Sequence, residues 1–201
     1  MYSDGDGLYA EKHYVPNNIK ITPEEEMEVY YYRSKVNKPI VRVYDAEYAN
    51  ANSLCTNDKN ITVYSEYIPY RLSETRNLNH GQGLYVLNES LIGFHELYHR
   101  FGPFPVSEDH IGFNQDGETK VWLNQNFATN HLERDSILLM ATTNPKNFDE
   151  RMNKRQEEEM VEDIWMAVDD HANFDFDFKA KVNEFREMNF VEARNILKEE
   201  I

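Results

Sequence analysis

A histidine and glutamate pattern stands in the middle of the chain, at His95-Glu96-Leu97-Tyr98-His99. In zinc hydrolases, two histidines one helical turn apart bind the metal, and the glutamate beside the first activates a water molecule. Gly102 matches an extended form of this pattern, which then requires a histidine where this chain has Pro105. The pattern predicts a zinc-dependent hydrolase using His95, Glu96 and His99 as one candidate function. The interpretation that we favour is a pair of ordinary histidines on a helix surface, with no metal.

A β-hairpin is the strongest local signal in the sequence. Residues 107–127 contain two short alternating apolar runs on either side of Asp116-Gly117. An Asp-Gly pair between such runs is typical of a tight turn that joins two antiparallel strands. We therefore predict strands over 110–113 and 119–123.

Several further elements are predicted around these residues. Apolar residues recur at three- and four-residue spacing, which predicts a helix over 84–101 that carries the two histidines; they are Leu84, Leu87, Leu91, Phe94, Tyr98 and Phe101. The other predicted elements are strands over 8–15, 40–44 and 61–67, helices over 22–35, 72–77 and 151–168, and one or two amphipathic helices within 174–201.

Composition bounds the possible partners. The chain has 201 residues, 40% of them hydrophobic, and a formal net charge of −15. This charge argues against nucleic acid and anionic membranes as partners. It is easier to reconcile with a basic partner surface, but a well-solvated surface alone is the simpler interpretation. Cys55 is the only cysteine, so a disulfide framework is excluded and a reducing compartment is expected. No apolar run approaches the ~20 residues that a membrane span needs, so we expect no membrane insertion.

Segments in the first half of the chain resemble parts of a protein kinase domain. Tyr9-Ala10-Glu11-Lys12 resembles the strand whose lysine holds the nucleotide phosphates. Counting back from Pro39-Ile40-Val41-Arg42, which is similar to a later strand of the small lobe, puts Glu28 at the position of that lysine's partner. Residues 63–67 resemble the fifth strand and the hinge. The resemblance implies a Lys12–Glu28 ion pair, for which we expect a structural role.

The second half continues this resemblance. The helix over 84–101 resembles the long helix under the catalytic loop, and the hairpin resembles the one that carries the catalytic residues. Asp163-Ile164-Trp165 resembles a helix signature whose aspartate bonds to the catalytic-loop backbone. The resemblance therefore implies a structural role for Asp163.

The catalytic residues of the family are missing. When the chain is aligned on Asp116-Gly117, Pro105 stands at the position of the catalytic aspartate and His110 at that of the metal-binding asparagine. The Asp-Phe-Gly slot begins at Leu123 and Asn124, so the principal magnesium ligand is missing too.

The phosphate-binding loop is missing as well, because only eleven residues precede Lys12. Glu108 and Asp109 are carboxylates close to the loop, but we do not expect the positions before His110 to face a substrate. The resemblance thus implies neither catalysis nor tight nucleotide binding, and no cofactor.

These observations predict an α+β protein with a protein kinase-like bilobal fold. Its expected parts are a flexible lead-in (1–7), a reduced small lobe (8–70), a truncated, mainly helical large lobe (71–173) and a C-terminal helical tail (174–201), whose docking the sequence leaves open. The expected function is that of a non-catalytic pseudokinase, a scaffold or interaction subunit of a larger protein complex. We expect it in the cytoplasm, with the cytoskeleton or cilium as candidate locations. A zinc hydrolase and a residual atypical kinase are the alternatives.

Overall fold

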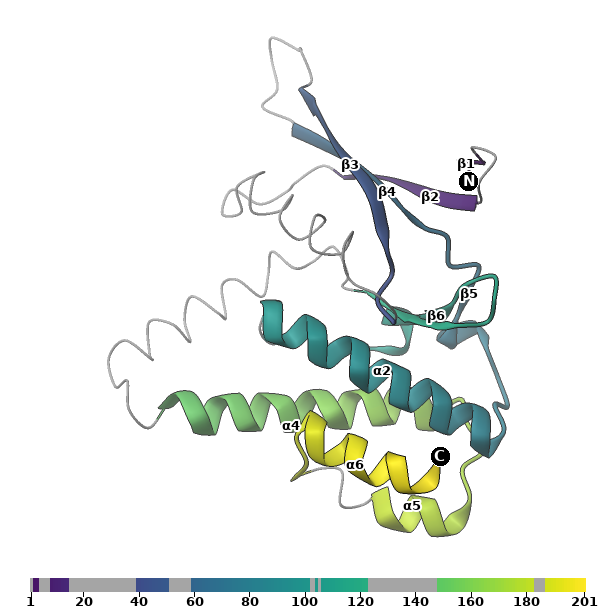
Figure 1. The fold of residues 1–201 in the computed structure, drawn as a ribbon, viewed down its shortest axis with the longest axis vertical. Helices are drawn as coiled ribbons and strands as arrows, with labels where there is room; N and C mark the ends of the chain where they lie inside the picture. Colours follow the sequence, from purple (N-terminus) through teal and green to yellow (C-terminus); the bar gives the residue numbers. More distant parts are fainter. Residues whose placement is uncertain are drawn as a thin grey trace.

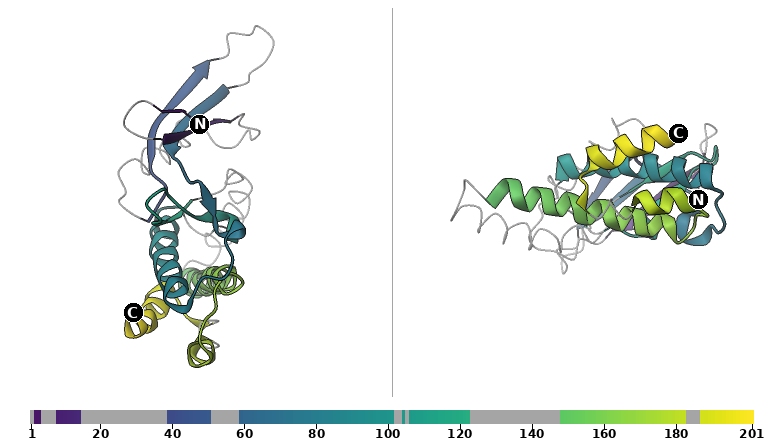
Figure 2. Two further views of the ribbon diagram at one scale, coloured as in Figure 1. Left: turned by 90° about the vertical axis from the view of Figure 1, so that its right-hand side faces the viewer. Right: turned by 90° about the horizontal axis from the view of Figure 1, so that it is seen from below.

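The computed structural model describes residues 2–3, 8–14, 39–50, 59–101, 104, 106–122, 148–182 and 187–201. Within these residues the chain is α+β, with two small sheets and four α-helices. The strands lie above the helices, the N-terminus lies beside the upper strands and the C-terminus lies among the helices (Figure 1). The view from the side separates the two regions most clearly (Figure 2). No helix in the described ranges is long and apolar enough to cross a membrane.

The larger sheet is antiparallel, with its strands in the order β1-β2-β4-β3. These strands are β1 (Tyr2–Ser3), β2 (Leu8–Tyr14), β3 (Val43–Asn50) and β4 (Lys59–Glu66). The strands predicted over 8–15 and 61–67 are confirmed. The one predicted over 40–44 is displaced, because β3 begins at Val43 and continues to Asn50. The helix predicted over 22–35 lies outside the described residues.

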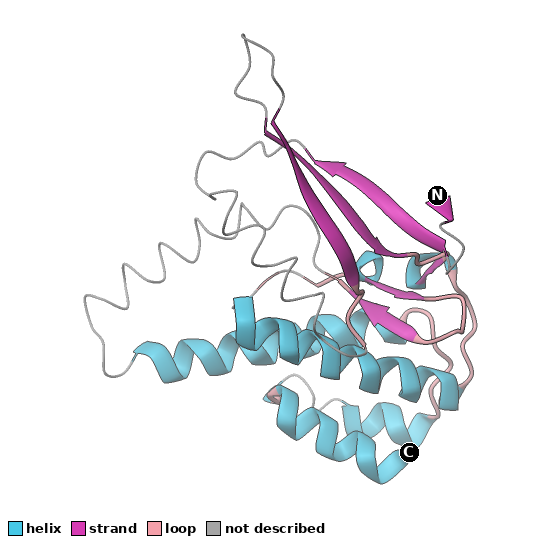
Figure 3. Cartoon of the chain, turned by 45° about the horizontal axis from the view of Figure 1, so that its top comes forward, coloured by secondary structure: helices cyan, strands magenta, loops and turns pink. Residues whose placement is uncertain are grey.

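The smaller sheet contains β5 (Tyr70–Arg71), β6 (Ile111–Phe113) and β7 (Thr119–Val121) in that order. Figure 3 shows short strands between the long strands and the helices. The segment that leads into β3 also touches this sheet. Val121 N donates to Pro39 O at 2.8 Å, and Val41 N donates to Val121 O at 2.9 Å. The segment 39–50 therefore joins the two sheets, because it pairs first with β7 and then with β4.

Two 3-10 helices change the bounds of predicted elements. The helix expected over 72–77 is the single turn η1 (Leu72–Glu74). The first hairpin strand begins at Ile111, because His110 closes the turn η2 (Glu108–His110) with a bond from its N–H to Ser107 O. The hairpin itself is confirmed by the antiparallel pairing of β6 and β7.

Helix α2 (His80–Phe101) provides the main apolar face of the core. It begins four residues earlier than predicted, because Asn79 and Gln82 form a capping box in which each side chain accepts the other's main-chain N–H at 3.0 Å. The side chains of Leu87, Leu91 and Phe94 are fully buried. The predicted helix over 151–168 is confirmed as α4 (Phe148–Asp169), which packs beside α2.

The C-terminal tail packs into the same core. It contains α5 (Phe176–Val182) and α6 (Phe190–Glu200), and Phe190, Ala193 and Leu197 of α6 are fully buried. Helix α6 contacts both α2 and α4. The question that the sequence left open is thus answered, since the tail docks. The domain boundaries at residues 70 and 173 stay predictions.

The contact between α2 and β7 is close enough to require a glycine. A Cβ atom on Gly93 would lie 2.4 Å from Val121 Cγ2 and 3.0 Å from Pro39 Cγ. We expect Gly93→Ala to lower the free energy of unfolding by about 1–2 kcal/mol, because overpacking costs more than the helix propensity that alanine gains. Urea denaturation followed by circular dichroism measures this change.

Gly81→Ala is the matched control, since the nearest atom to its added Cβ is 3.7 Å away. This variant should keep or slightly raise the stability of the protein. Equal effects of the two substitutions would show that α2 does not pack against β7 in this way.

Candidate functional site

The turn of the hairpin is held by the side chain of Asn114. Its Oδ1 accepts the N–H groups of Asp116 (3.1 Å) and Glu118 (2.9 Å). The main-chain N–H of Gly117 donates to Asn114 O at 3.0 Å. Gly117 has a φ of 76°, in the left-handed region that glycine adopts without strain. The Asp-Gly signal therefore located the turn correctly.

A buried lysine connects this hairpin to the larger sheet. Lys120 in β7 is only 5% exposed. Its Nζ lies 3.1 Å from Glu66 Oε1 at the end of β4 and 3.6 Å from Glu118 Oε2. The Nδ2 of Asn114 donates to the same two carboxylates at 3.0 Å. We call these four residues, Glu66, Asn114, Glu118 and Lys120, the junction network.

The polar groups of the junction network bond mainly to one another. One ammonium faces two carboxylates, so the formal charge of the network is −1, and Glu66 Oε2 also accepts the main-chain N–H of Arg42 at 3.2 Å. A buried charge is costly unless it is paired and hydrogen-bonded, and this arrangement meets both conditions. A lysine held in this way is better suited to holding the hairpin against the larger sheet than to binding a phosphate.

His110, at the predicted position of the metal-binding asparagine, lies beside the junction network. It is buried, and its Nδ1 is 3.2 Å from Ser107 N, which donates to it. Within the described residues its Nε2 has no hydrogen-bond partner. Burial lowers the pKa of His110 below its usual value. The ring is therefore a neutral, buried group.

Most of the other predicted site positions are not described. Lys12 lies in β2 opposite Val63, and the structure describes its backbone only. Glu28, Pro105, Leu123 and Asn124 lie outside the described residues. The expected loss of the catalytic positions and the Lys12–Glu28 pair stay predictions.

The two histidines of the zinc-like pattern lie on α2, where it meets α6. The ring of His95 is 4.3 Å from that of His99 and is stacked on Phe190 at 4.8 Å, between ring centroids. Glu96 is exposed. Among the described residues, no three side chains of the metal-binding types converge on one point. The zinc-hydrolase alternative stays a prediction.

The surroundings of His95 favour its neutral form. Burial, with His99 and Arg194 nearby, lowers the pKa of His95 to about 4. Glu157 of α4 reaches the same region and accepts the main-chain N–H of Phe190, and burial raises the pKa of its carboxyl. Stacking and capping at this point attach α6 to α2 and α4.

Asp163, the predicted structural aspartate, is exposed on α4. Desolvation, with the carboxylates of Glu162 and Glu159 nearby, raises the pKa of its carboxyl. The described residues supply no hydrogen-bond partner for it, and Gly102, Pro103 and Pro105 lie outside them. Its bond to the loop backbone stays a prediction.

The carboxylates before His110 bond to other parts of the fold. Asp109 accepts the hydroxyl of Ser73 at 2.9 Å. Glu108 Oε2 lies 2.5 Å from Nε2 of His171, whose Nδ1 faces Thr75 O at 2.7 Å. Sequence reasoning missed His171, Glu66 and Lys120. The alternation of the short strand predicts that Lys120 is exposed, because it puts Lys120 on the face away from Val121, whereas β7 is buried on both faces.

Comparison with known proteins adds no relative. The sequence matches no known protein family and no curated protein. The function must therefore be argued from the residues themselves.

Removing the buried cation tests the junction network. We expect Lys120→Met to lower the free energy of unfolding by about 3–5 kcal/mol, because it leaves Glu66 and Glu118 without their cation. Lys154→Met is the matched control, since Lys154 is 59% exposed and its pairing with Glu158 is worth about 0.5 kcal/mol or less. Urea denaturation measures both. A loss below about 1 kcal/mol for Lys120→Met would mean that the network is not buried.

The neutral state of His95 predicts a pH dependence. An unfolded imidazole takes up its proton near pH 6.5, whereas His95 in the folded protein does so only near pH 4. Within this window the unfolded state binds the additional proton, so stability falls as the pH falls. We expect His95→Phe, which preserves an aromatic ring on Phe190, to lose less stability between pH 6.5 and 4. The unfolding free energies of both proteins against pH provide the measurement, and identical slopes would contradict the burial of His95.

Proposed function

We propose that this chain is a non-catalytic, pseudokinase-like interaction subunit of a larger protein complex. The observation that carries the proposal is the junction network. Lys120, the one buried cation among the residues whose side chains the structure describes, is neutralised by Glu66 and Glu118 and is not available for a phosphate. Phosphoryl transfer depends on cations that face the transferred group. A lysine whose charge is already paired with two carboxylates therefore supports a role without catalysis.

The order of the elements also supports the proposal. Strand β4 leaves the larger sheet through 67–69 and enters β5 of the smaller sheet. Helix α2 follows and packs under β7. Helix α4 comes after the hairpin of β6 and β7, with Ile164 fully buried and Trp165 packed against Phe174 and Phe178. This is the succession of parts that the resemblance to protein kinases implies.

Exposed aromatic side chains supply contact points for a partner. Tyr70 is 62% exposed, Tyr44 is 53% exposed and Tyr85 is 47% exposed. Tyrosine is enriched among the residues that dominate binding at protein interfaces. The net charge of −15 favours a partner with a basic surface. We place this complex in the reducing cytoplasm, with the cytoskeleton or cilium as candidate locations.

Affinity purification of the tagged chain from its native cells, followed by native mass spectrometry, tests the proposal. We expect a complex of defined mass that contains at least one other protein. Tyr70→Ser should weaken the complex about fivefold or more, because an aromatic anchor contributes more than about 1 kcal/mol. Met166→Ser is the matched control, because Met166 is also exposed and apolar but lies on α4, away from Tyr70.

A nucleotide titration tests the same proposal from the other side. We expect ATP with magnesium to leave the melting temperature unchanged, because a ligand that does not bind the folded state does not stabilise it. A monomer without partners, whose melting temperature rises with ATP and magnesium, would favour the residual kinase.

A further inference from the structure

The two faces of the smaller sheet have different neighbours. Directly opposed residues of antiparallel strands share a face, so Ile111 and Val121 point to one side and Gly112 and Lys120 to the other. The first pair is fully buried and belongs to the core. The second pair includes Lys120 of the junction network, which reaches to Glu66 of the larger sheet. Trp122 follows Lys120 by two residues and shares this second face.

Gly112 leaves room for the indole of Trp122. A Cβ on Gly112 would lie 3.1 Å from Trp122 Cη2, 2.7 Å from Ile68 Cγ2 and 2.6 Å from the Tyr70 carbonyl oxygen. The indole and Ile68 therefore approach the same point on the bare backbone of β6. We call the space over Gly112, beside Ile68 and the Tyr70 carbonyl, which the indole of Trp122 reaches, the indole seat.

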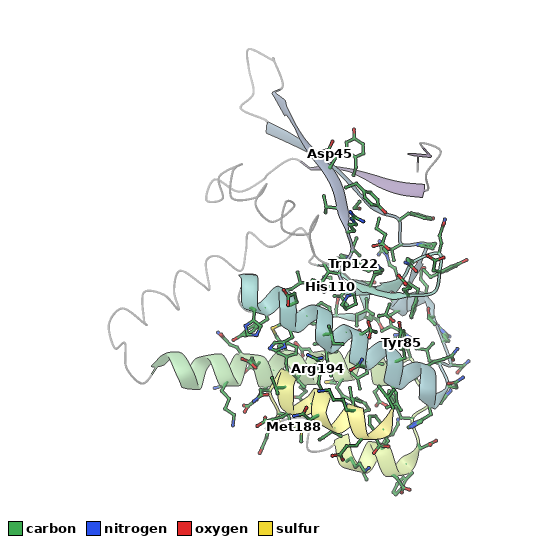
Figure 4. The ribbon with its side chains drawn as sticks, in the orientation of Figure 1. Asp45, Tyr85, His110, Trp122, Met188 and Arg194 are labelled. Carbon is green, nitrogen blue, oxygen red and sulfur yellow. The ribbon has the colours of Figure 1, made fainter. Side chains whose placement is uncertain are left out.

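The indole seat is separate from the main core. Among the described residues, Trp122 is half-buried and is not one of the side chains that pack against the core, whereas Trp165 is. Figure 4 places Trp122 beside His110, between the upper strands and α2. The indole thus fills the space between the hairpin and the segment 67–69 that links the two sheets.

We propose that Trp122 is the built-in occupant of a seat for planar aromatic rings, and that it closes the junction between the two sheets to such ligands. A flat ring on a glycine backbone beside an aliphatic side chain is held by shape and apolar contact, not by charge. Any planar ring of similar size would make the same contacts once the indole is removed. The seat stands on the geometry alone. Its consequence for nucleotides, exclusion of the base, rests on the proposed function.

Replacing the indole tests the proposal directly. Wild-type protein, Trp122→Ala and Trp122→Phe are melted with and without indole, and then with adenosine. We expect indole at about ten times its dissociation constant to raise the melting temperature of Trp122→Ala by about 3–5 °C. Wild-type protein, in which the indole covers Gly112, should not respond, and Trp122→Phe, whose shorter ring does not reach the position of Trp122 Cη2, should respond less than Trp122→Ala. Adenosine, a planar ring without phosphates, should likewise stabilise Trp122→Ala most.

Two results would overturn the proposal. The first is a wild-type protein that responds as strongly as Trp122→Ala, since its seat would then be open. The second is a folded Trp122→Ala that responds to neither probe, since no seat would then exist.

A fluorescence measurement covers the case in which Trp122→Ala does not fold. In Trp165→Phe, Trp122 is the only tryptophan, because the chain has two. We expect acrylamide to quench its emission about fivefold less in the native protein than in urea, because the seated indole is shielded. Equal quenching in both states would overturn the proposal. None of these measurements depends on a protein partner. The indole seat can therefore be disproved while the proposed interaction role holds, and the interaction role can be disproved while the seat holds.

Discussion

The approach of α2 to β7 at Gly93 is the contact on which the rest of the arrangement depends. Strands β6 and β7 have three residues each, too few for a hairpin to be stable alone in water. The absence of a side chain at Gly93 lets the helix lie directly on Val121, so the hairpin is held by the apolar face of α2. The opposite sides of the same helix pack against α4 and α6. One helix therefore joins the sheets to the helical region, and the C-terminal tail completes the burial of that helix.

The junction network performs the polar part of the same task. Burying Lys120 costs several kcal/mol in lost hydration, which close pairing with Glu66 and Glu118 offsets. Such a pair adds little net stability, but it tolerates only one relative position of β4 and the hairpin. Asn114 strengthens this restriction, because it holds the turn with Oδ1 and the two carboxylates with Nδ2. The apolar contact supplies the stability of this region, and the ionic contact sets its geometry.

Several side chains that look suited to chemistry are engaged in holding the fold. The ring of His95 stacks on Phe190, Glu108 bonds to His171, and Asp109 bonds to Ser73. Each of these side chains is held in place by its contact. The exposed tyrosines are oriented toward solvent, where a protein partner can reach them. This division between engaged polar groups and exposed aromatic ones is the physical basis of the proposed interaction role.

Local chemistry was enough to predict several elements of this protein from its sequence. The Asp-Gly turn, the apolar spacing of α2 and α4, and the alternation of β2 and β4 depend on residues close together in the chain. The start of α2 was placed too late because the prediction began at the first apolar residue, Leu84, although Asn79 and Gln82 carry the capping-box signal. The strand predicted over 40–44 was displaced because its beginning pairs with Val121, which is far away in the sequence. Only the tertiary structure decided that Lys120 is buried between two carboxylates, that His95 stacks on the tail and that Trp122 covers Gly112. Apart from Lys120 and Glu118, which are near neighbours in the chain, these contacts join residues that are far apart in the sequence, and no spacing within the sequence encodes which of them meet.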